Sequence, residues 1–411
     1  MSDDVSGAPP QGTIPLSFWG RALSHPASIS FAIVSLSVVL LQIPQEWYGR
    51  LWSVGTVSFG AAEIGLLCVV YAVFLSAWWL ASQMAHRGPR REAPPITVDR
   101  ASFAWLAVVT GAGALGVAYT IALLISRLGI SGILQAFASS QVNELKFALY
   151  DDYSIGFSSL RYCPIIAAPA AALLFMRMRM RSPWMVLILL VAVTSLLINS
   201  VISHRLSVVA ALAVYVVLHF RSGGRIAWRA VAISGVFVMM LLAALNSSRN
   251  ANFYNGIGLD NPLLAALAEG ITYVATPAQG ALAAMAGLLT GDFNHATGIS
   301  LELTTNSSLL EALRQFGYPG LFILLAMTTF WVFVYVKAYF ARRLELVCGA
   351  GVVGYAFAEF WRVFLFEYGI FFVLVSFTFI VGIAVRLGWN SINGARTLPP
   401  QRALIAPPPA R

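Results

Sequence analysis

The sequence predicts an all-α, polytopic membrane protein with about ten transmembrane helices and a large outer loop late in the chain. Three observations predict this fold class. Of the 411 residues, 59% are hydrophobic and 10% are charged, and the mean hydropathy is +0.78, which is outside the range of ordinary soluble domains. The chain contains a series of apolar runs, each about 20 residues long, which is the length that crosses roughly 30 Å of hydrocarbon. The positive charges fall mainly on alternate loops.

The predicted spans follow one another within residues 27–390, which form the predicted membrane domain. Their ranges are 27–44, 54–80, 102–126, 157–176, 183–202, 206–220, 230–246, 319–337, 347–366 and 370–388. Residues 1–26 are polar and lack the pattern of a cleavable signal peptide, so the first span is expected to direct insertion. Residues 391–411 contain five prolines, which predicts a disordered tail.

The distribution of Lys and Arg orients this bundle. Eighteen of the 26 fall on the side that holds both termini: Arg21, Arg87, Arg90, Arg91, Arg100, Arg177, Arg179, Arg181, Arg221, Arg225, Arg229, Lys337, Arg342, Arg343, Arg386, Arg396, Arg402 and Arg411. Because positively charged loops stay in the cytoplasm, both termini are expected there. The net charge of +9 is therefore interpreted as a topology signal, and a nucleic-acid partner is not expected.

Two outer segments, 127–156 and 247–318, are long enough to hold structure of their own. In the first, apolar residues recur at helical spacing: Leu134, Ala138, Val142, Leu145 and Leu149. This spacing predicts either a helix lying at the membrane surface or a solvated connector helix.

The second outer segment contains an apolar run at 262–288. Gly270, Pro277 and Gly280 interrupt it, and counting it as a crossing would move the cations of 337–343 to the outer side. The run is therefore predicted to form two short helices on the outer surface or partway into the bilayer.

Cysteines and acidic residues predict no metal site. Cys68, Cys163 and Cys348 fall inside predicted spans and are interpreted as small core residues. Asp151 and Asp152 are adjacent, so their side chains do not face one another, and they are interpreted as a solvated turn. No metal and no other cofactor is expected.

Arginines recur at the outer ends of the spans, at Arg161, Arg205, Arg249, Arg314 and Arg362. A guanidinium is costly at membrane depth, but its planar fork binds phosphate oxygens through two parallel hydrogen bonds. Several converging arginines would hold a pyrophosphate headgroup, whereas each one alone is explained as well by contact with lipid phosphates. Arg362 and Glu359, three residues apart on one predicted span, are also expected to neutralise one another.

The stretch from Thr305 to Leu321 reads TNSSLLEALRQFGYPGL and leads into the span 319–337. It resembles the pattern His-Asn-x-x-Leu, seven further residues, Gly-x-x-Gly-Leu that precedes a late helix in the O-antigen ligase and polymerase superfamily. The sequence His204-Arg205-Leu206-Ser207 resembles the arginine-led helix of that superfamily. The order of many spans followed by one large late outer loop is similar as well.

One position separates the two branches of this superfamily. Where a ligase carries His before the Asn, this chain has Thr305, and the nearest outer histidine is His295. A hydroxyl has no useful pKa near neutrality and cannot replace imidazole as a base. The chain therefore looks more similar to the Wzy-type oligosaccharide repeat-unit polymerases.

This resemblance implies a lipid-carrier-dependent glycosyltransferase in a bacterial inner membrane, with its large late loop in the periplasm. Its partners would be undecaprenyl-pyrophosphate-linked glycans and membrane lipids, and the resemblance allows a chain-length regulator as a further partner. A sugar hydroxyl of the acceptor would attack the anomeric carbon of the donor, and the lipid pyrophosphate would leave. For the reaction that the resemblance implies, Arg205, Arg249 and Arg314 are expected to bind the pyrophosphate, with Arg161 as an auxiliary contact.

Four residues are candidates for the base that accepts the hydroxyl proton: Glu311, Glu144, Asp260 and His295. Glu311 is preferred because three residues separate it from Arg314 on one predicted helix, although an ordinary ion pair explains that spacing as well. Asn306 is expected to cap this helix, with any substrate contact in addition.

Two other functions remain open. A ligase that transfers the glycan to a lipid A core would need His295 as its base. A flippase or exporter of lipid-linked sugar would carry cations through the depth of the bilayer, whereas these arginines are predicted at one outer level. A structural membrane scaffold does not account for the recurring outer arginines.

Overall fold

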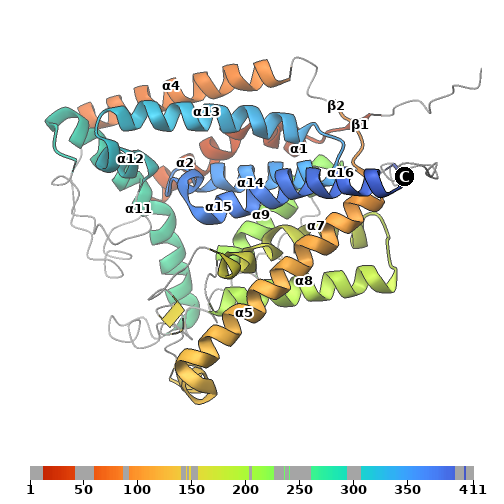
Figure 1. Ribbon diagram of the computed structural model, residues 1–411. Coiled ribbons are helices and arrows are strands. Elements are labelled where there is room, and N and C mark those ends of the chain that lie inside the picture. Colours follow the sequence, from red (N-terminus) through yellow and green to blue (C-terminus); the bar gives the residue numbers. More distant parts are fainter. Residues whose placement is uncertain are drawn as a thin grey trace, which may run out of the picture.

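The computed structural model describes residues 13–41, 60–86, 92–139, 145, 148–149, 156–202, 206–225, 236, 240, 261–293, 307–393 and 402–403. They form a helical bundle (Figure 1). Its helices are α1 (Phe18–Leu23), α2 (Pro26–Leu41), α4 (Ala61–Ala85), α5 (Arg100–Ala138), η1 (Phe157–Tyr162), α7 (Pro164–Met176), α8 (Pro183–Ile202), α9 (Leu206–Arg221), α11 (Pro262–Thr290), α12 (Ser308–Phe316), α13 (Pro319–Tyr339), α14 (Leu344–Glu359), η2 (Leu365–Glu367), α15 (Gly369–Val375), the π-helix η3 (Ser376–Ile380) and α16 (Val381–Asn393).

Six of the described helices are long and apolar enough to cross a membrane, which confirms the prediction of an all-α membrane protein. They are Ala61–Ala85, Arg100–Ala138, Phe157–Met176, Pro183–Ile202, Pro319–Tyr339 and Gly369–Ile392. Three further predicted spans are helices of 16 residues each: α2, α9 and α14. Most of the predicted span 230–246 lies outside the described residues.

Two predicted elements differ from the structure. The prediction of two short helices at 262–288 was wrong, because α11 is one helix of 29 residues that contains Pro277. Its start is fixed by the Asn261 side chain, whose Oδ1 accepts from the backbone N–H of Leu263 at 2.9 Å. In Figure 1, α11 runs across α4 and α13 rather than alongside them, and it packs on α2 and α4.

The predicted span 347–366 ends too late. Helix α14 stops at Glu359, and the chain then turns through η2 before α15 begins. The backbone N–H groups of Arg362 and Val363 both donate to the Glu359 carbonyl, at 2.8 and 2.9 Å, and these two hydrogen bonds close the turn. Residues 360–368 therefore form a connection that lies next to α12.

The outer helix predicted in 127–156 begins at a bend within α5, where Gly129 takes φ +65°. Leu145 and Leu149 pack with Leu124 and Ala136 in a small apolar cluster. The Leu134 side chain, on the same predicted helix, is 63% exposed. Cys68 is likewise exposed, whereas Cys163 and Cys348 are buried as predicted.

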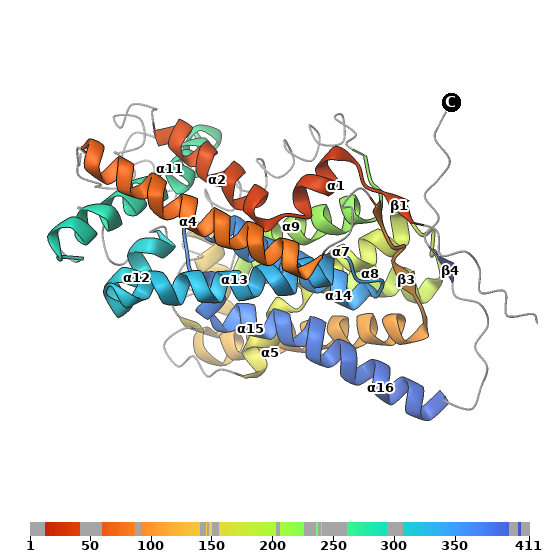
Figure 2. The ribbon, with the colours of Figure 1, turned by 90° about the horizontal axis from the view of Figure 1, so that it is seen from above.

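One end of the bundle gathers segments that the charge pattern predicts on one side. Strand β1 (Ile14–Pro15) pairs with β2 (Glu92–Ala93), and β3 (Thr97–Val98) pairs with β4 (Arg402–Ala403). Residues from near both termini therefore lie at the same end. We call this end, which carries Arg21, Arg177, Arg221, Arg342 and Arg386, the positive end. Helix α12 lies at the opposite end in both views (Figures 1 and 2).

The buried side chains of Arg221 and Tyr339 hold the positive end together. The Arg221 guanidinium is fully buried and donates to the carbonyls of Pro94 at 2.7 Å, Ala341 at 2.9 Å and Tyr339. The Arg221 side chain thereby attaches the end of α9 to the segment before α5 and to the end of α13. The Tyr339 hydroxyl donates to the Gly20 carbonyl at 2.7 Å, which attaches α1 to α13.

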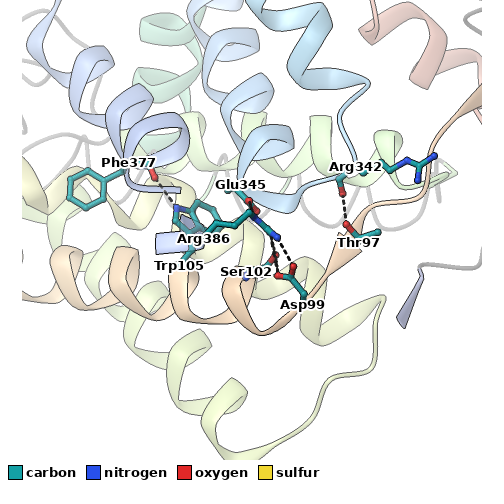
Figure 3. Close-up of polar contacts among 8 residues, drawn as sticks. All are labelled: Thr97, Asp99, Ser102, Trp105, Arg342, Glu345, Phe377 and Arg386. Atoms are coloured by element: carbon teal, nitrogen blue, oxygen red, sulfur yellow. Dashed lines mark hydrogen bonds and ion pairs between the residues drawn. The ribbon is translucent and has the colours of Figure 1, made fainter. Parts of the chain in front are cut away.

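A second network joins α5, α14 and α16 (Figure 3). The Arg386 guanidinium binds Glu345 Oε1 at 2.9 Å and both oxygens of Asp99. Asp99 also caps α5 by accepting the Ser102 N–H at 2.8 Å. The Trp105 indole donates to the Phe377 carbonyl at 2.7 Å, within the π-helix. These contacts fix the last long helix to two earlier ones.

Candidate functional site

The motif helix α12 occupies the end of the molecule opposite the positive end. Helix α13 follows it directly, and its 21 residues place α12 about 30 Å from Tyr339. Two motif glycines make the sharp turn between the helices. Gly317 has φ +64°, and a Cβ on Gly320 would lie 2.2 Å from the Ala312 carbonyl oxygen. The Gly-x-x-Gly part of the motif therefore folds α12 back onto α13.

Glu311 connects α12 to the turn after α14. Its Oε1 accepts from the Tyr368 hydroxyl at 2.9 Å, and its Oε2 accepts from the Phe364 N–H at 3.1 Å. Both oxygens are thus occupied by segment 360–368. The ion pair of Glu311 with Arg314 that its spacing suggests is not among the contacts of the described residues.

Glu367 lies beside Glu311 and is a residue that sequence reasoning missed. Its carboxylate is partly buried and makes no hydrogen bond or ion pair within the described part of the chain. Burial, and then the negative charge of Glu311, raise the pKa of Glu367 above its usual 4.5. Burial and Glu311 also raise the pKa of the Tyr368 hydroxyl. The structure therefore brings two carboxyl groups and a phenol together.

Arg314 lies on the same short helix as Glu311, one turn further on. Its side chain is partly buried, and its Nε donates to the Phe293 carbonyl at 3.2 Å, just after α11. Burial lowers the pKa of Arg314 from its ordinary 12.5, but a guanidinium remains charged at physiological pH. Arg314 thus presents a partly desolvated cation where α11 and α12 meet.

Glu359 and Arg362 form the ion pair that their spacing predicts, although Arg362 lies in the turn beyond α14 rather than on the helix. Its Nη2 and Nε are 2.5 and 2.7 Å from Glu359 Oε2, and both residues are buried. The guanidinium also lies over the Tyr273 ring of α11, at 4.1 Å from the centroid. Arg362 is therefore already engaged by protein groups.

Arg161 is 1% exposed in η1, and its Nη2 donates to the Tyr162 hydroxyl at 3.2 Å. η1 packs closely on α5, because a Cβ on Gly116 would lie 2.2 Å from the Arg161 backbone nitrogen. η1 also packs on α15. This deep burial in protein excludes simple contact with lipid headgroups as the role of Arg161.

Six other predicted site residues lie outside the described residues: Arg205, Arg249, Glu144, Asp260, His295 and Asn306. Among the described residues, no group of three or more His, Cys, Asp or Glu side chains is arranged to hold a metal ion.

Tyr368 and Glu367 carry one sequence signal that could have identified them. They stand directly before the predicted span 370–388, at its predicted outer end, where polar residues next to a membrane helix are candidates for a site. Their contact with Glu311 has no signal in a single sequence, since more than fifty positions separate them.

No protein-family model, curated protein or solved structure matches this chain. The resemblance to the O-antigen ligase and polymerase superfamily therefore depends on the quoted motif residues and on the predicted order of the spans.

Proposed function

We propose that this protein is a glycan polymerase that joins oligosaccharide repeat units carried on undecaprenyl pyrophosphate, at the outer face of a bacterial inner membrane. One observation carries the proposal. Glu311 and Arg314 lie one turn apart on a short helix that a glycine turn fixes opposite the positive end, with two further acidic or phenolic groups, Glu367 and Tyr368, beside Glu311.

The proposed reaction needs the two kinds of group that meet there. The acceptor hydroxyl oxygen forms a bond to the anomeric carbon, while the bond from that carbon to the pyrophosphate breaks and its electron pair leaves with the phosphate. A carboxylate accepts the hydroxyl proton, and cations stabilise the charge that develops on the leaving group. Arg314 is the described residue proposed for this role. Arg205 and Arg249 are proposed to join it, and Arg161 to support them.

Reconstitution tests this function directly. The purified protein is placed in liposomes with undecaprenyl-pyrophosphate-linked repeat units, and the lipid-linked products are separated by length. The expected result is a ladder of carrier-linked chains in the absence of any lipid A core. Arg314→Ala should remove the ladder, whereas Arg343→Ala, an exposed cation at the positive end, should leave it unchanged.

Two results would assign a different function to the protein. Transfer of glycan only when a core acceptor is supplied would make the protein a ligase. Movement of unaltered repeat units across the bilayer, without a change in their length, would make it a flippase.

A further inference from the structure

The group formed by Glu311, Glu367 and Tyr368 contains two carboxyl groups with different surroundings. Glu311 accepts hydrogen bonds at both oxygens, one from a backbone N–H and one from a hydroxyl. Glu367 lies in η2, partly exposed, and its carboxylate has no hydrogen bond or ion pair with another described residue. Two neighbouring carboxyl groups that have different surroundings can take different chemical roles.

Glu311 is poorly suited to take up a proton during the reaction. Protonation of either oxygen would weaken the bond to Tyr368 or to Phe364, and these bonds hold segment 360–368 against α12. Glu367 can change its protonation state without breaking a described contact, and its partial exposure leaves it open to a ligand.

We propose that Glu367 is the catalytic base that accepts the proton of the attacking sugar hydroxyl, and that Glu311 and Tyr368 are positioning residues that hold it in place. This assignment rests on the proposed polymerase function. The hydroxyl oxygen forms its bond to the anomeric carbon, its proton passes to the Glu367 carboxylate, and the carbon–oxygen bond to the lipid pyrophosphate breaks with its electron pair on the phosphate.

The electrostatics of the group agree with this role. Glu311 is the neighbouring charge that affects Glu367, after burial, and both effects raise the pKa of Glu367. A base is more effective when its pKa lies closer to the working pH. Tyr368 touches Glu311, and Arg362 acts on Tyr368 from the turn after α14, while Arg362 is itself paired with Glu359.

Buried hydroxyl groups on the same side of α12 give a second observation. Ser307 and Ser308 are fully buried, and their Oγ atoms have no hydrogen-bond partner among the described residues. They precede Glu311 by four and three positions, which places them on its side of the helix. Buried hydroxyl groups are usually hydrogen-bonded. The two serine hydroxyl groups therefore offer unused hydrogen bonds beside Glu311, which the hydroxyl groups of a glycan can satisfy.

The test measures chain extension by the full-length protein in liposomes, as a function of pH. The wild-type rate is expected to fall on acidification with a midpoint above 4.5, the ordinary pKa of Glu. Glu367→Gln should lower the rate at neutral pH by about 10²- to 10⁴-fold and abolish this acid limb. Glu367→Asp, which retains a carboxyl group, should restore part of the rate and the acid limb.

Two further variants separate positioning from catalysis. Tyr368→Phe should move the acid limb and lower the rate by no more than about tenfold, because Glu367 itself remains. Glu92→Gln, the same change at an exposed carboxylate of the positive end, should leave rate and pH profile unchanged. Binding of the lipid-linked donor, measured separately, should be equal in wild type and Glu367→Gln, which also shows that the variant is folded.

The outcomes separate the two proposals. A Glu367→Gln variant with the wild-type rate and pH profile, together with an inactive Arg314→Ala variant, would overturn the role of Glu367 and leave the polymerase function in place. A wild-type protein that extends no chains would overturn both. A Glu367→Gln variant that no longer binds donor would assign Glu367 to binding instead.

Discussion

Arg386 binds Asp99 across 287 positions of sequence, and the same guanidinium binds Glu345. One cation therefore neutralises carboxylates from two other helices. Glu345 is 2% exposed, and its Oε2 has no hydrogen-bond partner among the described residues. The network is thus sensitive to the loss of its single positive charge, because both carboxylates would then stay partly buried without a counter-ion.

Replacing Arg386 with Ala should lower the stability of the protein by about 3 kcal/mol, the usual cost of removing one partner of a buried ion pair. The measurement is the melting temperature of the detergent-solubilised protein. Arg343→Ala, an exposed cation at the same end, is the matched control and should melt like the wild type. Equal melting temperatures for the two variants would contradict the role of Arg386.

The contacts of the Asp99 carboxyl group predict that the stability of the protein depends on pH. Burial alone would raise its pKa, but the hydrogen bonds from Arg386 and Ser102, with the charge of Arg386, lower it below the ordinary 3.8. A lowered folded-state pKa gives stability that is fully present above 3.8 and is lost as the pH falls through the folded value. Melting temperature measured against pH should therefore decline below about pH 4 in the wild type, and less steeply in Asp99→Asn. If the melting temperatures of the wild type and Asp99→Asn declined in parallel, Asp99 would not be the source of the pH dependence.

The close packing of the glycine turn after α12 predicts that a side chain added at Gly320 lowers stability. Gly320→Ala should destabilise the protein by about 1–3 kcal/mol, because the new Cβ would overlap the Ala312 carbonyl. Gly65→Ala in α4 is the control, since nothing lies within 4 Å of its Cβ, and it should be neutral or stabilising. The Gly320 variant should also lose chain extension, since α12 carries Glu311 and Arg314. Wild-type melting and activity in Gly320→Ala would show that the turn adapts.

Arg205 and Arg249 give a prediction from the sequence alone. Replacing either with Ala should leave folded protein in the membrane but abolish chain extension, because the leaving pyrophosphate would lose a cation. Product length on gels and the amount of membrane-inserted protein are the two readouts. Near-normal polymer length in both variants would remove these residues from the site.

Hydropathy and charge predicted much of the fold, because both are local properties of the chain. The ranges 157–176 and 183–202 are helical as predicted. The end of α14 was missed because residues 360–366 are as apolar as a span, and only the turn bonds to Glu359 distinguish them. The single helix α11 was missed because Pro277 was interpreted as a break, although a helix kept in place by its neighbours tolerates proline.

The candidate site could be predicted only in part. The pairing of Glu359 with Arg362 follows from three-residue spacing on the chain. The same rule suggested an ion pair of Glu311 with Arg314, but Glu311 instead binds Tyr368 and Phe364. Tyr368 and Phe364 belong to a distant segment, which the packing of α14 and α15 brings next to α12. A single sequence does not reveal such contacts.

Arg386 belongs to the last long helix, so the network with Asp99 and Glu345 closes only when nearly the whole chain has left the ribosome. Until then, Asp99 and Glu345 lack the cation that binds them both. A chain that stops before residue 386 therefore lacks more than one helix, since it also exposes uncompensated charge on two others. We expect such truncated chains to be recognised and degraded by membrane quality control.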